Sequence, residues 1–192
     1  HRKQDLYRHC GTTCQGVLAM TRNTLRHLRG FTLIELMVTL AIVAVLSMVA
    51  VPNFTAFQRN SELSSVANNF VGAMNTARTE AMKRNANALV APTTGTNWAD
   101  GWSVFVDVNR NGTFDVGTDV LVTTYPALPT YLTATASANN ALFNGSGYSF
   151  DSGGLSNLTI TIARNDVPAA ETLEQTRRIK VATTGRVRSC KG

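Results

Sequence analysis

A single carboxylate, Glu35, stands inside an otherwise uncharged run that extends from Phe31 to Val51. A carboxylate within a membrane helix costs about 2.5–3.5 kcal/mol on insertion scales, so such a group is expected to have a charge partner. If the chain is cut between Gly30 and Phe31, the new α-amino group of Phe31 lies one helical turn from Glu35. The carboxylate then also faces the positive end of the helix dipole. The spacing therefore predicts an amine–carboxylate pair that exists only after proteolysis.

A second set of charged residues closes the sequence, "TRRIKVATTGRVRSCKG", where two basic clusters flank an expected turn at 183–185. In an extended segment, Arg186 and Arg188 project to the same side, about 7 Å apart. This spacing suits the phosphates of a nucleic-acid backbone, and Gly185 would let that backbone approach closely. The other cations of this expected site are Arg177, Arg178, Lys180 and Lys191. The alternative is that these are solvated charges on an edge strand, where Lys and Arg discourage aggregation.

The segment "GWSVFVDVNRNGTFDVGTDVLVTT" contains a possible ligand set for calcium. Asp107, Asn109 and Asn111 match the first half of a calcium loop, which makes them weak metal candidates. The second half does not match, because Thr118 stands where a bidentate Glu is required and strands are expected on both sides. An Asn-Gly pair at a hairpin tip explains the pattern without a metal. We therefore expect a hairpin here, and no metal or other cofactor.

The distribution of charge and of reactive residues disfavours an enzyme. The formal net charge is +6, but six basic residues against one acidic lie in residues 1–30, and six basic residues follow the last acid, Glu174. All three histidines and two of the three cysteines precede Gly30. A chain cut there has no histidine, and Cys190 is its only cysteine. Zinc sites, Ser-His-Asp triads and Cys-His pairs would then lack their usual parts.

The apolar run from Phe31 to Val51 is expected to be a membrane-spanning helix that carries Glu35. It is long enough to cross about 30 Å of hydrocarbon as a helix, and the cluster Arg22, Arg26 and Arg29 predicts a cytoplasmic N-terminus. A secretory signal peptide is disfavoured, because the run is too long and lacks a small-residue cleavage signal. Pro52 predicts a kink rather than an end.

Beyond the run, apolar residues at intervals of three or four predict an amphipathic helix to about Asn85, packed through one stripe in the core. The stripe consists of Phe54, Phe57, Leu63, Val66, Phe70, Met74, Ala77 and Ala81. From Ala86 onward the period is two, which predicts short strands and an α+β fold with an antiparallel sheet packed on the helix. The expected strands lie near 88–91, 102–108, 120–124, 130–136, 148–151, 158–163 and 177–182.

Two motifs carry a resemblance to a known family. "RGFTLIELMV" resembles the processing site of type IV pilins and pseudopilins, and "GWxVFVDxNxxGxxD" resembles the GspH/FimT group within these pilin-like proteins. The resemblance extends from Arg29 to Cys190. It implies cleavage after Gly30 by prepilin peptidase, N-methylation of Phe31, and assembly with other major and minor pilins or pseudopilins. In that family the counterpart of Glu35 attracts the amine of a neighbouring subunit during assembly.

The resemblance also implies an organisation of the chain. Residues 1–30 would be the leader, 31–52 the transmembrane and assembly helix, and 53–192 the head, with a helix at 53–85 and a sheet at 86–192. Because family leaders are short and basic, "MTRNTLRHLRG" makes Met20 the expected initiator. The protein would cross the bacterial inner membrane once, with a periplasmic head, before it enters a filament.

The last motif bears on function. "GRVRSC" resembles the C-terminal GRxR element of FimT-type minor pilins, which bind DNA during natural transformation. It implies a minor pilin near the filament tip that binds DNA. Aromatic stacking platforms for single strands are not evident near the tail, so we expect binding to duplex DNA without sequence preference. H-type pseudopilins of type II secretion systems also end in a basic strand, so a structural tip subunit without DNA binding is the alternative.

Overall fold

The computed structural model describes residues 30–151 and 154–192. Residues 1–29 of the expected leader, including the expected initiator Met20, lie outside the described residues. The chain divides into two compact units, the first ending at Val45 and the second extending over Leu46–Gly192. The described part of the first unit is the beginning of the single α-helix of these residues, α1 (Leu33–Arg84), and the second unit holds the rest of α1 and all the described strands.

Helix α1 begins and ends with recognisable local signals. The hydroxyl of Thr32, just before the first helical residue, accepts a hydrogen bond from the Glu35 N–H at 3.2 Å, which satisfies one unpaired donor of the first turn. At the other end Asn85 has φ 49°, and the Ala86 N–H donates to the Ala81 carbonyl at 3.1 Å. A left-handed residue after the last turn is a common helix ending. The helix predicted over 31–85 is thus confirmed, and it continues through Pro52.

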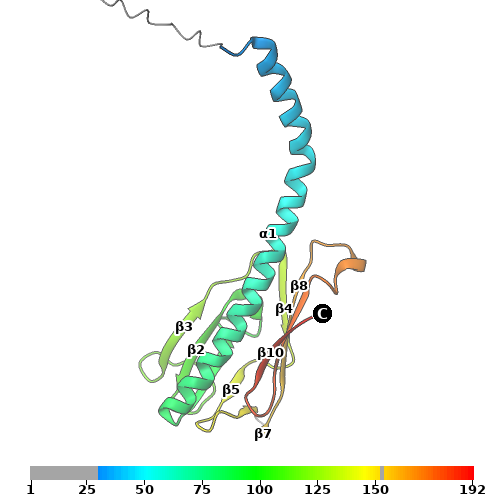
Figure 1. Ribbon diagram of the computed structural model, residues 1–192. Helices are drawn as coiled ribbons and strands as arrows, with labels where there is room; N and C mark the ends of the chain where they lie inside the picture. Colours follow the sequence, from blue (N-terminus) through cyan, green and yellow to red (C-terminus); the bar gives the residue numbers. More distant parts are fainter. Residues whose placement is uncertain (1–29, 152–153) are drawn as a thin grey trace, which may run out of the picture. The chain divides into compact units, whose positions relative to one another are not determined.

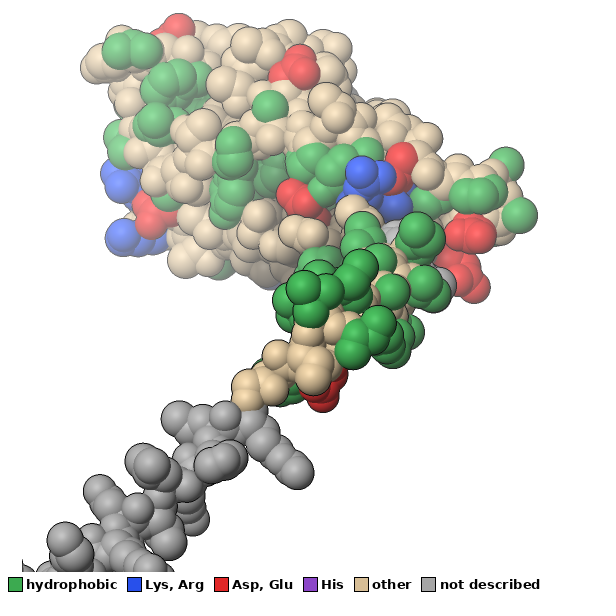
Figure 2. All heavy atoms as spheres, turned by 90° about the horizontal axis from the view of Figure 1, so that it is seen from above, with side chains coloured by type: hydrophobic (Ala, Val, Ile, Leu, Met, Phe, Trp, Pro, Cys, Tyr) green, Lys and Arg blue, Asp and Glu red, His purple; other side chains and the backbone are tan. Residues whose placement is uncertain are grey.

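The large hydrophobic side chains described between Phe31 and Phe57 are exposed. Figure 2 shows hydrophobic side chains covering this part of α1. Among the described residues, no helix combines the length and the apolar character that a membrane crossing needs. The transmembrane segment expected over 31–52 stays a prediction.

The second unit contains two antiparallel sheets, where the sequence predicted one (Figure 1). The six-stranded sheet has the order β3-β2-β1-β5-β6-β7 and the four-stranded sheet has the order β10-β9-β8-β4. The strands of the first are β1 (Asn87–Pro92), β2 (Trp102–Asp107), β3 (Val120–Tyr125), β5 (Ala141–Phe143), β6 (Ser149–Asp151) and β7 (Gly154–Leu155). Those of the second are β4 (Leu132–Ala136), β8 (Leu158–Arg164), β9 (Thr176–Val181) and β10 (Val187–Lys191). Two short 3-10 turns, η1 (Trp98–Asp100) and η2 (Ala169–Glu171), lie in the connections.

One face of α1 and the inner faces of both sheets form the core. The helix contributes buried residues from Leu63 to Ala81, at intervals of three or four. Phe70 stacks on Trp102 of β2 with ring centroids 3.7 Å apart, and Trp102 stacks on Tyr125 of β3 at 4.9 Å. The helix is thereby fixed to the six-stranded sheet by a column of three aromatic rings.

The predicted stripe is wrong at its N-terminal end. Phe54 and Phe57 are 67% and 69% exposed, whereas Leu63 is fully buried. Periodicity identifies the apolar side of a helix, but it does not show over which residues that side packs against the sheets.

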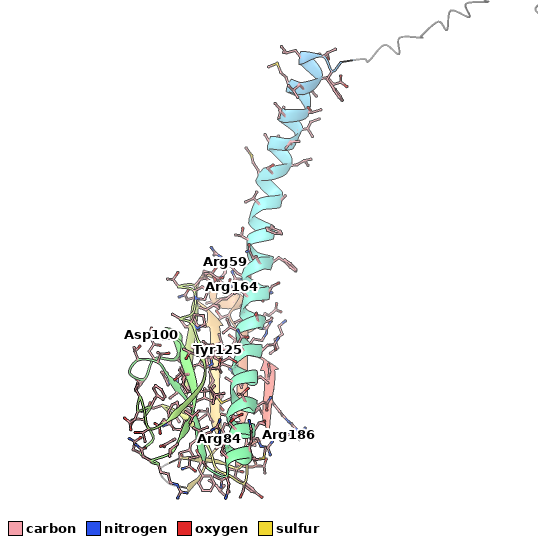
Figure 3. The ribbon with its side chains drawn as sticks, turned by 90° about the vertical axis from the view of Figure 1, so that its left-hand side faces the viewer. Arg59, Arg84, Asp100, Tyr125, Arg164 and Arg186 are labelled. Carbon is pink, nitrogen blue, oxygen red and sulfur yellow. The ribbon has the colours of Figure 1, made fainter. Side chains whose placement is uncertain are left out.

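A cluster of charged residues joins α1 to the four-stranded sheet. Asp166, just after β8, accepts two hydrogen bonds from Arg164, each at 2.9 Å, and one from Arg59 of α1 at 2.5 Å. Arg164 and, less strongly, Arg59 hold the pKa of the Asp166 carboxyl well below its usual range. Burial, reinforced by a hydrogen bond from the Tyr131 hydroxyl to Glu62 of α1, raises the pKa of Tyr131 to about 12. Arg59 and Arg164 lie at the same end of the second unit (Figure 3).

Candidate functional site

The basic C-terminal segment forms a hairpin of β9 and β10. Its turn is closed by hydrogen bonds from the Gly185 N–H to the Ala182 carbonyl at 2.8 Å and from the Ala182 N–H to the Arg186 carbonyl at 2.9 Å. The turn predicted at 183–185 is confirmed. The sequence did not resolve β10 as a separate strand paired with β9.

The register of this hairpin determines which cations share a face. Arg188 lies opposite Lys180, and Cys190 lies opposite Arg178. Directly opposed residues project to the same side of a sheet, and the alternating residues Ile179 and Val181 are buried. The outer face therefore carries four exposed cations, named here the basic cluster: Arg178, Lys180, Arg186 and Arg188.

Two other cations of the predicted site do not belong to this cluster. Arg177 lies on the inner side of β9, where its guanidinium donates to the carbonyls of Glu174 and Thr176 at 3.0 and 2.9 Å and to the Ser64 hydroxyl of α1 at 3.5 Å. Lys191 lies opposite Arg177 and so shares its side of the hairpin. The sequence grouped all six cations because adjacency along the chain does not reveal the face of each side chain.

Gly185 occupies a different environment from the one predicted. It is buried, has φ +74°, and a Cβ built there would lie 2.0 Å from the Gly147 carbonyl oxygen and 2.8 Å from Nε of Arg78. Arg78, on α1, donates from Nε to the Gly147 carbonyl at 3.0 Å and from Nη2 to the Thr184 carbonyl at 3.3 Å. The glycine is required for packing of the turn on its neighbours, which explains it without a nucleic-acid backbone.

The basic cluster differs from six other described cations in having no partner. Four cations form salt bridges with carboxylates, namely Arg59, Lys83, Arg84 and Arg164. Arg78 and Arg177 donate to backbone carbonyls. Within residues 30–151 and 154–192, no member of the basic cluster forms an ion pair or a side-chain hydrogen bond.

A surface hollow of about 570 Å³ lies beside the cluster. Lys180, Arg186 and Arg188 line it together with Asn157 and Thr159, and no carboxylate is among the lining residues. Like charges placed directly opposite each other on neighbouring strands are unfavourable, and Arg188 faces Lys180 in this way. Figure 3 shows Arg186 next to β10, the edge strand of the four-stranded sheet. This arrangement of unpaired donors can bind an anion such as a phosphate.

Asn157 and Thr159 belong to this site as well, although the sequence alone did not point to them. Thr159 on β8 lies opposite Lys180, and the Asn157 side-chain oxygen accepts a hydrogen bond from the Thr183 N–H at 3.0 Å. Neither residue belongs to a motif in the sequence, since only the pairing of β8 with β9 brings them to the basic cluster.

The second predicted site, at Gly30, Phe31 and Glu35, lies in the first unit. Glu35 occupies the first turn of α1, where a negative charge is favoured by the helix dipole. Thr32 and Glu35 also have the spacing of a capping box, a signal for the start of a helix that is present in the sequence. Cleavage after Gly30, methylation of Phe31 and the assembly role of Glu35 stay predictions.

The possible calcium loop between β2 and β3 is held together by hydrogen bonds from its backbone N–H groups to its own side chains. Asp107 is 1% exposed and accepts hydrogen bonds from the N–H groups of Asn111 and Gly112 at 3.2 and 2.8 Å. The Asn109 oxygen also accepts from the Asn111 N–H, at 3.2 Å. In the part of the chain that the structure describes, no group of three or more His, Cys, Asp or Glu side chains is placed to hold a metal ion. The loop is therefore a hairpin connection whose turn is fixed by the side chains of Asp107 and Asn109.

Comparisons with known proteins agree with this architecture. The family model described as "Type II transport protein GspH" matches residues 66–185, and that of the "Prokaryotic N-terminal methylation motif" matches residues 25–51. The type IV major pilin protein PilA of Myxococcus xanthus (strain DK1622) is 51% identical over 41 residues, which are 21% of this chain and 19% of that protein. The chain thus matches about a fifth of the length of this curated relative.

The solved structures include the type IV minor pilin FimU of Pseudomonas aeruginosa (strain PAO1) in two crystal forms. One has a TM-score of 0.55 at 18% identity and covers 69% of this chain and 90% of FimU. The other has a TM-score of 0.51 at 17% identity and covers 66% and 91% of the two chains. At these identities the likeness shows the fold alone, which is the predicted pilin-like α+β fold.

The GspH model covers most of the strands and the buried half of α1, and the methylation motif covers the segment around Gly30. These proteins are structural subunits of pili and pseudopili rather than enzymes. The chain belongs to the GspH family of type IV pilin-like minor pilins and pseudopilins, and it carries the N-terminal methylation motif of that class.

Proposed function

We propose that this protein is a minor type IV pilin that binds double-stranded DNA through its basic cluster, for DNA uptake in natural transformation. Prepilin peptidase would cut after Gly30, and Phe31 would be N-methylated. The segment 31–52 would then anchor the subunit in the inner membrane, with the head in the periplasm, until it joins other pilins in a filament.

One observation carries the DNA-binding proposal. Six of the described cations are engaged by carboxylates or carbonyls, whereas the four of the basic cluster are exposed, unpaired and on one face. An acid-free cationic face attracts polyanions, and the unpaired guanidiniums offer the forked donors that phosphates accept. Phosphate contacts of this kind carry no sequence information, so the binding is expected to be independent of sequence.

The assembly part of the proposal depends on Glu35. After cleavage, the methylated amine of Phe31 is a cation in an otherwise apolar segment, and a carboxylate is the partner it needs. Mass spectrometry of the membrane-extracted protein tests this step, and we expect an N-methylated Phe31 at the N-terminus. A Phe31 still joined to its leader would contradict the proposal.

A gel shift with labelled duplex DNA tests the binding. The full-length protein in a non-ionic detergent is compared with the double variant Arg186→Ala, Arg188→Ala at low and at high salt. The matched control is Lys83→Ala, Arg84→Ala, which also removes two cations, but ones paired with Glu80. We expect the first variant to shift the DNA more weakly at low salt and not at high salt, and the control to behave as the parent does. Absence of a shift for the parent even at low salt would refute DNA binding.

The description of the matching family model, type II transport, supports one alternative. In that case the protein is a structural tip pseudopilin, and its basic face contacts another subunit rather than DNA. The two functions differ in the gel shift, and also in the cell. The double arginine variant would impair protein secretion in the alternative, whereas it would impair DNA uptake and leave secretion intact in the favoured function.

A further inference from the structure

We propose that the DNA-binding surface is wider than the basic cluster and extends over the outer face of the four-stranded sheet, where threonine hydroxyls of β8 and β4 contact backbone phosphates. This inference rests on the proposed DNA-binding function. It assigns Thr135, Thr159 and Thr161, named here the threonine set, to the same surface as the cations.

The strand register places the threonine set in line with the cations. Thr159 lies opposite Lys180, which in turn lies opposite Arg188. In a second row Thr135 lies opposite Thr161, and Thr161 lies opposite Arg178. Each row runs across the strands, and the rows are about 7 Å apart because they differ by two residues along each strand.

The alternation of burial confirms that these residues share the outer face. On β8 the intervening residues Leu158, Ile160 and Ile162 are buried in the core, while Thr159 and Thr161 are half-buried. On β4 Thr135 is exposed between Ala134 and the half-buried Ala136. The rows of cations and threonines therefore form one continuous surface, from the edge strand β10 to the edge strand β4.

The composition of this face suits a phosphate backbone rather than bases. The strands β4, β8, β9 and β10 contain no Asp or Glu and no aromatic residue. The absence of carboxylates removes repulsion of phosphates, and the absence of aromatic side chains on these strands removes the stacking platforms that single strands use. With neighbouring strands about 4.8 Å apart, the four-stranded face is about 14 Å wide, and the cations occupy only its β9–β10 half.

The hydroxyls of the threonine set are available to an incoming acceptor. None of the three donates a hydrogen bond to another described residue. Thr133, on the same strand as Thr135, shows the contrast, because its hydroxyl donates to the Ala163 carbonyl at 3.2 Å. Threonine hydroxyls are common donors to phosphate oxygens in protein–DNA interfaces.

The cations and the threonine hydroxyls should affect the salt dependence of DNA binding differently. A cation that neutralises a phosphate releases a counterion, so it contributes about 0.9 to the slope of log K against log salt. A neutral hydroxyl releases none. Removing the hydroxyls should therefore weaken binding without changing the slope, whereas removing a cation should change both.

Fluorescence anisotropy of a labelled DNA duplex, titrated with the full-length protein in detergent at several salt concentrations, tests the inference. The variant is Thr135→Val, Thr159→Val, Thr161→Val, which keeps the β-branched shape that suits a strand. We expect its affinity to fall tenfold or more, with an unchanged salt slope. The control is Thr123→Val, Thr124→Val on β3 of the other sheet, and it should bind as the parent does.

A second variant separates contact from folding. Replacing the same three threonines by serine keeps the hydroxyls, so this variant should bind like the parent. If the valine variant binds like the parent, or if the serine variant loses as much affinity as the valine variant, the extended surface is refuted while the basic cluster keeps its role. If the parent itself does not bind the duplex, the proposed function fails, and the extension fails with it.

Discussion

The substitution Gly185→Ala tests most sharply what the β9–β10 turn requires. The glycine has φ +74°, a conformation that costs an L-residue about 1–2 kcal/mol. The added methyl group would also lie 2.0 Å from the Gly147 carbonyl oxygen, so one of the two backbone segments must move. Overpacking of this kind costs about 1–3 kcal/mol.

The two costs together lower the free energy of unfolding by about 2–5 kcal/mol. For a domain of this size 1 kcal/mol corresponds to about 3 °C in Tm, so thermal unfolding followed by near-UV circular dichroism should shift by roughly 6–15 °C. The matched control is Gly112→Ala, because Gly112 has φ +79° but nothing within 4 Å of the added methyl group. The control should show the conformational cost alone.

The expected result follows from packing and not from DNA binding. If Gly185→Ala unfolds at the same temperature as Gly112→Ala, the close contact with Gly147 has no energetic consequence and the packing account is wrong. If Gly185→Ala keeps the parent's stability but loses DNA binding, the glycine serves the approach of a nucleic-acid backbone, as the sequence suggested.

Three further predictions concern the core and the charged cluster around Asp166. Because its pKa is lowered in the folded state, Asp166 stabilises the fold fully above its unfolded pKa of about 3.9 and loses this effect as the pH falls towards its lower folded pKa. Asp166→Asn should therefore unfold more easily in urea at pH 7, and its difference from the parent should shrink steadily as the pH falls below about 4. A difference that does not shrink below that pH would contradict this. The pKa of Tyr131 is raised to about 12, so the free energy of unfolding should fall as the pH rises from about 10 to 12. Tyr131→Phe should lack this fall. If the variant shows the same pH profile of stability as the parent, the burial of the hydroxyl has no such effect. Phe70→Ala removes the ring between α1 and Trp102 and should cost about 3–5 kcal/mol in urea unfolding; a cost below about 1 kcal/mol would show that the aromatic column does not hold the helix.

Much of the fold followed from local patterns in the sequence. The helix, its approximate end at Asn85 and seven strands could be predicted, because each has a clear hydrophobic period and is bounded by turn residues. The strands β5 and β7, with three and two residues, and the edge strand β10 were not predicted. The division into two sheets depends on pairing between strands far apart in the chain, which no local pattern contains.

The candidate site was predictable in composition but not in geometry. The sequence placed Arg186 and Arg188 on one side correctly, because an extended chain alternates. It could not separate Arg177, which faces α1, from Arg178, which faces outward, since that depends on which side of β9 meets the core. The role of Gly185 was equally hidden, because its neighbour Gly147 lies on a distant hairpin.

The salt dependence of duplex DNA binding by the full-length parent protein tests the central claim most directly. If the four cations of the basic cluster each neutralise one phosphate, log K should fall linearly with log salt with a slope of roughly −3.6, and the double variant Arg186→Ala, Arg188→Ala should reduce the magnitude of that slope to about 1.8. A slope near zero, or the same slope in parent and variant, would contradict the account.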